Sequence, residues 1–210
     1  MKHGLFITFE GIDGCGKSTQ IKKAAQYLTK KGIQYILTRE PGGTPVAEII
    51  RDVILSPENS AMTNSCELLL YLAARAQHVT EKIVPALENG TVVLCDRFQE
   101  ATFAYQGFGR GIPLHKLQLL NEFATGGLVP SRTFIFDISV ECAFERMRKM
   151  NKAPDRLENN SKEFYQNIRE GYLSLASAHP NRITLLRGDN AIDEIFDDVK
   201  KEIELLLNQE

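Results

Sequence analysis

Short apolar runs alternate along the chain with longer segments in which apolar positions recur with a helical period. The short runs are rich in β-branched and aromatic residues and show little alternation of polar and apolar side chains. That pattern is typical of strands buried on both faces of a parallel sheet. We expect five such strands, at residues 5–9, 34–38, 91–95, 133–137 and 183–186.

The longer segments between these runs predict helices. Gly32 ends the first of them, and Pro85 predicts a kink inside the third. The expected helices cover residues 17–31, 45–55, 65–88, 114–124, 140–150, 161–178 and 192–208. Strands that alternate with helices in this way predict an α/β fold with a doubly wound, five-stranded parallel sheet. At 210 residues, the chain has the length of one such domain, over residues 1–210.

Directly after the first predicted strand, residues 9–20 read FEGIDGCGKSTQ and contain the pattern G-x-x-x-x-G-K-[ST]. Glycines allow a tight turn whose N–H groups bind phosphates, and the helix that follows adds its partial positive charge. We expect Lys17 to reach the β- and γ-phosphates from an exposed position, and Ser18 to bind Mg²⁺. The predicted ATP-binding residues here are Gly11, Ile12, Asp13, Gly14, Cys15, Gly16, Lys17, Ser18 and Thr19.

Composition and charge narrow the function further. The chain is 43% hydrophobic and 25% charged with a formal net charge of −2, which argues against a nucleic-acid partner. No apolar run approaches the roughly 20 residues of a membrane helix, and the N-terminus lacks a cleavable signal pattern. The four cysteines are far apart in sequence. We therefore expect reduced thiols in a cytoplasmic protein, with Cys15 as a small residue that fills the loop.

Two other classes of phosphate-loop protein fit the sequence less well. A guanine-reading switch needs N-K-x-D, whereas residues 151–155 read N-K-A-P-D, and no D-x-x-G follows the third predicted strand. A motor or repair ATPase needs an acid that binds the metal, and Asp96 at the end of that strand could serve. Arg97 beside it, however, suits a second anion better than it suits the orientation of water.

Three further clusters contain candidate ligand-binding residues. They read TREPGGTP at 38–45, YLAARAQH at 71–78 and DRFQEATFAYQGFGRG at 96–111. Arg39 and Arg97 each follow a predicted strand, and the carboxyl ends of parallel strands meet at one edge of a sheet. Two arginines there predict a second phosphate, on an acceptor nucleotide. Tyr71 and Arg75 are spaced to share one helix face.

With these clusters, and DRLE at 155–158, nearly the whole chain resembles the bacterial thymidylate kinases, a family of P-loop nucleoside monophosphate kinases. The resemblance implies transfer of the γ-phosphoryl group of ATP to dTMP, for deoxythymidine nucleotide synthesis. It also implies Mg²⁺ as cofactor, held by Ser18 and Asp96, and a homodimer. A kinase for another nucleoside monophosphate, or an ATP-hydrolysing regulatory or repair module, stays open as an alternative.

The resemblance also implies roles in binding dTMP. Asp13 would hold the sugar 3′-hydroxyl, Arg39 and Arg97 the monophosphate, and Tyr71 and Arg75 the base, while the base- and sugar-lining residues would be Thr102, Tyr105 and Gln106. The chain departs from the family in three places. Phe98 stands where the family often has Tyr, and Ala101 and Phe103 stand where many relatives have Ser and Gln.

A lid is implied at about residues 146–157, within ERMRKMNKAPDRLE. Some relatives carry an arginine at the position of Gly14, so here the lid should supply it. Arg146 is expected to bind ATP, and Arg148 to act on the transferring phosphate together with Lys17, Asp13 and Arg97. The other basic residues of the segment, as alternatives to Arg148, are Lys149, Lys152 and Arg156.

Overall fold

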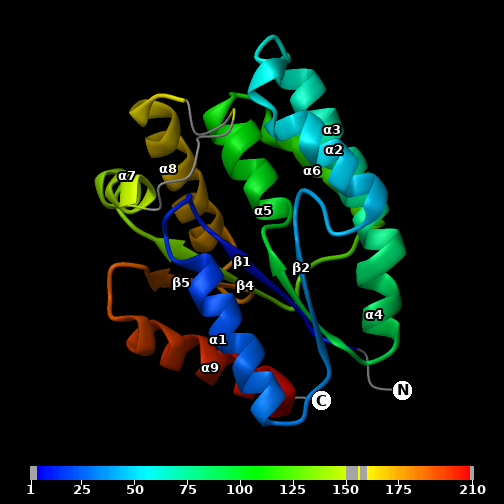
Figure 1. Cartoon of the computed structure of the whole chain (residues 1–210), viewed down its shortest axis with the longest axis vertical. Helices are drawn as coiled ribbons and strands as arrows, with labels where there is room; N and C mark the ends of the chain where they lie inside the picture. Colours follow the sequence, from blue (N-terminus) through cyan, green and yellow to red (C-terminus); the bar gives the residue numbers. More distant parts are fainter. Residues whose placement is uncertain (1–3, 150–155, 157–159, 209–210) are drawn as a thin grey trace.

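The computed structural model describes residues 4–149, 156 and 160–208 of the chain. At its centre five parallel strands form a sheet in the order β2-β3-β1-β4-β5 (Figure 1). The predicted strands are confirmed, with each end within one residue of its expected position. The strands are β1 (Phe6–Glu10), β2 (Tyr35–Arg39), β3 (Val92–Asp96), β4 (Arg132–Asp137) and β5 (Ile183–Arg187).

Helices connect the strands, as the sequence pattern predicted. The α-helices are α1 (Lys17–Lys30), α2 (Pro45–Leu55), α3 (Asn64–His78), α4 (Val84–Glu88), α5 (Gln99–Thr102), α6 (Leu114–Thr125), α7 (Val140–Lys149), α8 (Lys162–Ala178) and α9 (Ile192–Asn208). Three shorter segments are the 3₁₀-helix η1 (Pro57–Asn59) and the π-helical segments η2 (Val79–Ile83) and η3 (Phe103–Gly109). The doubly wound parallel sheet expected from the sequence is therefore confirmed.

The single kinked helix expected at residues 65–88 is instead three segments. The regular helix α3 ends at His78, and η2 carries the chain through a π-helical turn before α4 begins. Pro85 lies in the first turn of α4, directly after the π-helical segment, and it has no N–H to donate to a carbonyl oxygen of that segment. The backbone hydrogen bonding therefore changes from α-helical to π-helical at Val79, six residues before the proline.

Helical structure at residues 99–109 was not expected. α5 and η3 carry three aromatic side chains and two glycines with no clear helical period. Tertiary packing stabilises this segment instead, because α8 crosses η3 very closely. A β-carbon at Gly171 of α8 would lie 2.8 Å from the ring of Phe108. Only a glycine allows that approach.

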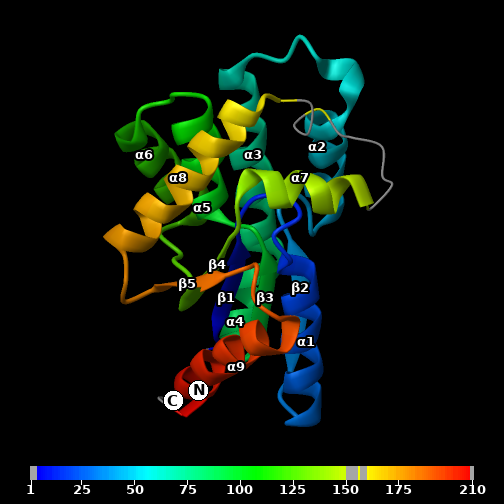
Figure 2. The ribbon, with the colours of Figure 1, turned by 90° about the vertical axis from the view of Figure 1, so that its left-hand side faces the viewer.

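Successive side chains of the central strands enter different cores. Ile7 and Phe9 of β1 belong to a large apolar cluster with residues of α1, α8 and α9, such as Leu28 and Val199. Phe6 belongs to a second cluster, with residues of η2 and α4. Figure 2 shows α1 and α9 side by side in the lower half of the view and α8 in its upper half. These three helices pack in the first cluster, on one face of the sheet, and η2 and α4 pack in the second, on the other face. Both faces of the sheet are thus covered, as its apolar strands require.

The loops that follow β1, β2 and β3 leave the sheet at one edge. Because the strands are parallel, their carboxyl ends lie together, and this edge is where such folds bind ligands. In the part of the chain that the structure describes, no helix combines the length and the apolar character needed to cross a bilayer.

Candidate active site

The loop between β1 and α1 turns on glycines in the left-handed region of backbone space. Gly14 and Gly16 have φ angles of 81° and 101°, which residues with side chains rarely adopt. Gly16 is also the N-cap of α1, so the loop leads directly into a helix N-terminus with unpaired N–H groups. This arrangement is suited to phosphates.

Gly14 lies against helix α7. A β-carbon at this position would come within 2.8 Å of the carbonyl oxygen of Ala143. Arg146, one turn further along α7, directs Nη1 to the carbonyl oxygens of Gly14, at 3.4 Å, and of Gly188, at 3.0 Å. The position where some relatives have an arginine is therefore closed by α7, which itself brings an arginine to the loop.

Lys17 is held inside the loop and not exposed as we expected. Its side chain is buried, and Nζ donates to the carbonyl oxygens of Gly11 at 2.9 Å and Ile12 at 3.1 Å. Cys15 is buried beside it, and this burial raises the pKa of the Cys15 thiol despite the nearby Lys17. Cys15 therefore fills the loop as a neutral side chain.

Asp13 and Arg97 form the central ion pair of the site. Arg97 Nη2 lies 2.6 Å from Asp13 Oδ1, and the Tyr105 hydroxyl donates to Asp13 Oδ2 at 3.4 Å. Burial alone would raise the pKa of Asp13, but Arg97 and then Lys17 lower it to about 2. Asp13 is thus a carboxylate at any physiological pH.

The backbone of Arg97 turns its side chain toward the phosphate loop. Its φ of 71° makes it the one non-glycine residue with positive φ among those described. Such strain persists where the surroundings hold it, most often at functional sites. Besides Asp13, the guanidinium contacts the carbonyl oxygen of Gly11 at 3.0 Å and the Tyr172 hydroxyl at 3.3 Å. Arg97 thereby joins the loops after β1 and β3.

A buried carboxyl group lies below Arg97, and the sequence analysis missed it. Glu10 Oε1 accepts from the Phe98 N–H at 2.6 Å, and Oε2 accepts from the Tyr172 hydroxyl at 2.8 Å. Burial, and then the nearby Glu100 carboxylate, raise the pKa of Glu10 from 4.5 to about 8. A glutamate at the end of a strand that is otherwise apolar except for Thr8 is the sequence signal that could have indicated this group.

Two oxygen groups at the end of the loop could hold a divalent cation. The hydroxyl of Ser18 lies 3.5 Å from Asp96 Oδ2, at the mouth of the phosphate loop. Hydroxyl and carboxylate oxygens are the hard ligands that Mg²⁺ prefers, and Mg²⁺ typically takes one or two protein ligands beside phosphates and water. The residues present therefore fit the ion.

Two arginines lie on the side of β2 and α2. Arg39 is half-exposed and forms an ion pair with Glu48 at 2.8 Å, and both it and Arg51 line the cleft. Arg51, whose Nη1 donates to the carbonyl oxygen of Pro41 at 2.7 Å, was not among the expected residues. In the sequence, the one indication of Arg51 is that it follows Glu48 by three positions on a predicted helix, so that the two side chains share a helix face.

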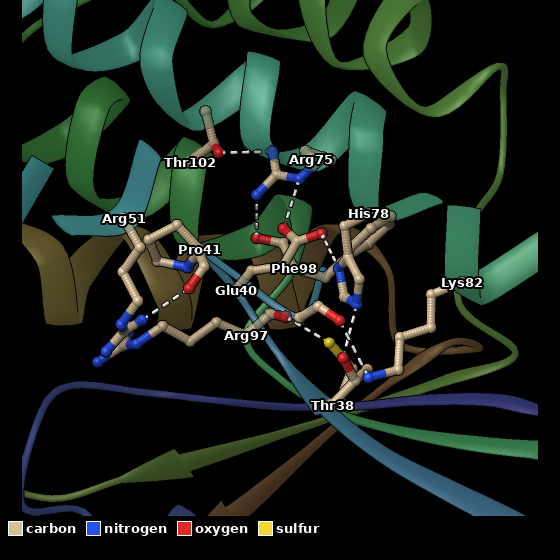
Figure 3. Close-up of polar contacts among 12 residues, drawn as sticks. Thr38, Glu40, Pro41, Arg51, Arg75, His78, Lys82, Arg97, Phe98 and Thr102 are labelled. Atoms are coloured by element: carbon tan, nitrogen blue, oxygen red, sulfur yellow. Dashed lines mark hydrogen bonds and ion pairs between the residues drawn. The ribbon is translucent and has the colours of Figure 1, made fainter. Parts of the chain in front are cut away.

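Arg75 is almost fully buried and held on every side (Figure 3). Nε donates to Glu40 at 2.7 Å, Nη1 donates to Thr102 at 2.7 Å, and Nη2 donates to the carbonyl oxygen of Phe98 at 2.9 Å. Nη1 also donates to Asn121. Thr102, which we expected to line the base site, is thus engaged with Arg75. Gln106 is engaged too, because Nε2 donates to Glu67 at 3.1 Å.

The expected lid residues differ in position. Arg148 is exposed near the end of α7, and the structure does not bring it to the cleft. Arg156 pairs with Glu67 at 2.5 Å, a buried carboxylate that also receives Arg110 at 3.3 Å. Lys149 is exposed, and Lys152 lies outside the described residues. Arg156 is therefore anchored to α2 and α3 and is not part of the cleft lining.

One cleft of about 340 Å³ connects the phosphate loop to the residues expected to bind the acceptor. Buried parts of the loop, namely Gly11, Ile12 and Cys15, are not in its lining, and neither is Arg146. The expected site residues that line it are Asp13, Gly14, Gly16, Lys17, Ser18, Thr19, Arg39, Tyr71, Arg75, Asp96, Arg97, Thr102, Tyr105 and Gln106. A phosphate-binding loop and a second basic subsite thus share one space.

Comparisons with known proteins agree with this geometry. Residues 9–199 match the family model described as thymidylate kinase. The thymidylate kinase of Symbiobacterium thermophilum is 46% identical over 203 residues, covering 97% of this chain and 94% of that protein. The thymidylate kinase of Geotalea daltonii is 50% identical over 197 residues, covering 91% and 92%. A crystal structure of thymidylate kinase from Ehrlichia chaffeensis superposes with a TM-score of 0.78 at 32% identity, covering 96% and 99%.

Proposed function

The chain belongs to the thymidylate kinase family and transfers the γ-phosphoryl group of ATP to dTMP, and we propose that the cleft described above holds both substrates. One observation carries this assignment. Lys17 and Arg97 line the same space, so a donor phosphate at the loop and an acceptor phosphate at the end of β3 would be neighbours. Phosphoryl transfer depends mainly on such positioning and on charge neutralisation.

The donor half is the loop of residues 11–18 together with Arg146. Lys17 leaves the carbonyl oxygens of Gly11 and Ile12 when phosphates enter, and it then bridges the β- and γ-phosphates. Ser18 and Asp96 would hold Mg²⁺, and the ion would supply positive charge to the phosphate oxygens when bound. Arg146 lies beside Gly14 and Gly188 and contacts ATP from the α7 side.

The acceptor half binds dTMP through its phosphate, sugar and base. Arg39, Arg51 and Arg97 take the monophosphate, for which guanidinium groups are suited by their paired N–H groups. Asp13, held ionised by Arg97, accepts from the sugar 3′-hydroxyl. Tyr105 packs under the sugar, Tyr71 stacks on thymine, and Arg75 reads the base edge. Thr102 and Gln106 complete the wall between base and sugar.

Arg148 acts on the transferring phosphoryl group once ATP is bound. Position 14 has no arginine in this chain, and Arg146, which α7 brings to Gly14, is assigned to ATP. Arg148 follows it on α7 outside the cleft lining, so it has to move toward the phosphates to act. Exclusion of water by the closed site directs the phosphoryl group to dTMP and away from hydrolysis.

An acceptor panel with Mg²⁺-ATP tests the function. We expect dTMP to have the highest kcat/KM and dUMP to be several-fold to tenfold lower, because a methyl-sized contact contributes about 1 kcal/mol. Ribonucleotides should be roughly 10–100-fold lower, because their 2′-hydroxyl would be buried against Tyr105 without a partner. A ranking led by AMP or dGMP would show another nucleoside monophosphate kinase. Rapid ATP turnover without any acceptor would indicate a hydrolytic module.

The expected homodimer is supported by an apolar surface on α3 and α6. These helices pack together through Leu68 and Leu117, while Leu69, Leu119 and Phe123 on their other sides are 58%, 66% and 90% exposed. A second copy of the chain covers this surface. Light scattering should give twice the chain mass, and Phe123→Asp should give the single-chain mass. A monomeric wild-type protein would contradict the assignment.

A cytoplasmic location is supported by the cysteines. Cys15, Cys66, Cys95 and Cys142 are all free thiols, two of them buried. Free thiols persist in a reducing compartment.

A further inference from the structure

The Glu40 carboxylate lies between two side chains of helix α3, as Figure 3 shows. Oε2 accepts from Arg75 Nε at 2.7 Å, and Oε1 faces His78 Nδ1 at 3.0 Å. Glu40, Arg75 and His78 are 5%, 2% and 0% exposed, so water does not satisfy these groups. Arg75 and His78 are three residues apart on one helix face, and both reach the loop after β2. The carboxylate thus couples two buried donors.

Arg75 has a fixed orientation as a result. Four of its five N–H groups donate to Glu40, Thr102, Asn121 and the carbonyl oxygen of Phe98. Within the described part of the chain, the remaining N–H, on Nη2, meets no protein acceptor, and Arg75 lines the cleft. Arg75 therefore offers a ligand one N–H in one direction.

A single fixed donor discriminates between pyrimidines by the group that meets it. Thymine presents the O4 carbonyl, which accepts a hydrogen bond, whereas cytosine presents an N4 amino group, which only donates. Two donors that face each other in a dry site leave both unpaired. A site built to hydrogen-bond one group strongly rejects the analogue that lacks it. Loss of the fixed orientation would let Arg75 turn away from the amino group and accept cytosine.

His78 holds Glu40 from the side opposite Arg75. Its Nδ1 faces a carboxylate, which only accepts, so Nδ1 carries the proton. Its Nε2 lies 2.6 Å from the hydroxyl of Thr38 in β2. The loop wraps closely around the ring, because a β-carbon at Gly43 would lie 2.5 Å from Nε2. The row from Thr38 through His78 and Glu40 to Arg75 thus ties the base side of the cleft to the sheet.

We propose that Glu40 and His78 are positioning residues for base selection, which fix the single ligand-facing N–H of Arg75 and thereby set the preference for thymine over cytosine. The inference rests on the proposed function, in which Arg75 reads the base. His78 is not part of the cleft lining, whereas Glu40 is, beside Arg75. Both oxygens of Glu40 are engaged by Arg75 and His78, so the role assigned to the two residues is exerted through Arg75.

Two substitutions at one position separate positioning from stability. In His78→Asn the amide nitrogen replaces Nδ1 and keeps the donor to Glu40, but the contact to Thr38 is lost. In His78→Gln the amide replaces Nε2 and keeps the contact to Thr38, but the donor to Glu40 is lost. Each substitution removes one buried hydrogen bond of similar kind, so a difference between the two variants reports positioning and not stability. The readout is the ratio of kcat/KM for dTMP to kcat/KM for dCMP, which an unfolded fraction does not change.

We expect the ratio in His78→Gln to be about tenfold below that in His78→Asn, as the loss of one buried hydrogen bond predicts. Thr38→Val, which removes the same contact as His78→Asn, should match His78→Asn. Glu40→Gln has one acceptor oxygen for two donors, so its ratio should fall at least as far as the ratio of His78→Gln. The KM for ATP should be equal in all four variants.

Arg75→Lys distinguishes failure of this inference from failure of the proposed function. If Arg75→Lys lowers the ratio while the two His78 variants have equal ratios, Arg75 reads the base but His78 and Glu40 do not position it, and the inference is wrong. If Arg75→Lys leaves the ratio at the wild-type value, the assigned role of Arg75 is wrong and the inference fails with it.

Discussion

Arg97 Nη2 lies 2.6 Å from Asp13 Oδ1, an ion pair that joins the loop after β1 to the loop after β3. The pair places one positive and one negative group at the point where the two substrates meet in the proposed assignment. Arg97 also contacts the carbonyl oxygen of Gly11, so the guanidinium is already oriented before a phosphate arrives. Pre-orientation of this kind reduces the entropy that substrate binding would otherwise remove.

Arg97→Ala should lower kcat/KM for dTMP by about 10²–10³, the usual effect of removing one well-placed donor in an active site. Arg97→Lys should also be poor, because an ammonium cannot grip a phosphate with two parallel N–H groups. We expect both the KM for dTMP and kcat to change. Steady-state kinetics with each substrate varied in turn measures this. An effect on the KM for ATP alone would place Arg97 in the donor site.

Lys17→Met should lower kcat by roughly 10²–10³, because the variant lacks the charge that bridges the β- and γ-phosphates. Since Lys17 is buried, Lys17→Ala should show the same loss of rate and a lower Tm as well, because it leaves a cavity. Methionine matches the lysine stem in length and serves as the control for packing. A folded Lys17→Met variant with near-normal kcat would contradict the assignment of the phosphate loop.

Arg148→Ala should lower kcat and leave the KM for dTMP nearly unchanged, because the arginine acts only on the transferring phosphoryl group. Its exposed position on α7 means that the substitution should not alter the Tm. Single-turnover kinetics with saturating dTMP measures the chemical step.

Arg156→Ala is the matched control, because Arg156 pairs with the buried Glu67 at 2.5 Å. It should lower the free energy of unfolding by about 1–3 kcal/mol, with Arg110 and Gln106 still bonded to Glu67. Urea denaturation separates the two variants. Wild-type rates in Arg146→Ala, Arg148→Ala and Arg156→Ala together would move the role to Lys149 or Lys152.

Glu10→Gln should become more stable than the wild type as the pH rises. The pKa of Glu10 is raised from 4.5 to about 8, so between these values the folded wild type binds a proton that the unfolded chain has lost. Its free energy of unfolding therefore falls with increasing pH across this window, by up to about 1.4 kcal/mol per pH unit for a single group. Glutamine is neutral throughout and has no such dependence.

Urea denaturation of the wild type and Glu10→Gln at pH 5 and pH 8 measures the difference. The advantage of the variant should be larger at pH 8 than at pH 5. An equal difference at the two pH values would mean that Glu10 titrates normally in the folded protein.

The sequence by itself determined the sheet, the phosphate loop and the two arginines at the strand ends. Each of these depends on short-range information. Apolar runs predict buried strands, the glycine spacing predicts the loop, and parallel strands must bring their carboxyl ends together. The expected positions of Asp13, Arg39, Tyr71, Arg75 and Arg97 around one cleft followed from those rules and from the family resemblance.

Only the tertiary structure decided which charged groups are buried and what each one contacts. Glu10 and Tyr172 are separated by 162 positions, and Glu67 and Arg156 by 89, yet each pair forms a hydrogen bond. The same holds for Glu40 in the loop after β2, whose two partners, Arg75 and His78, come from helix α3. The physical reason is that the energy of a buried charge depends on its distance to groups on other elements, and no local pattern contains those distances.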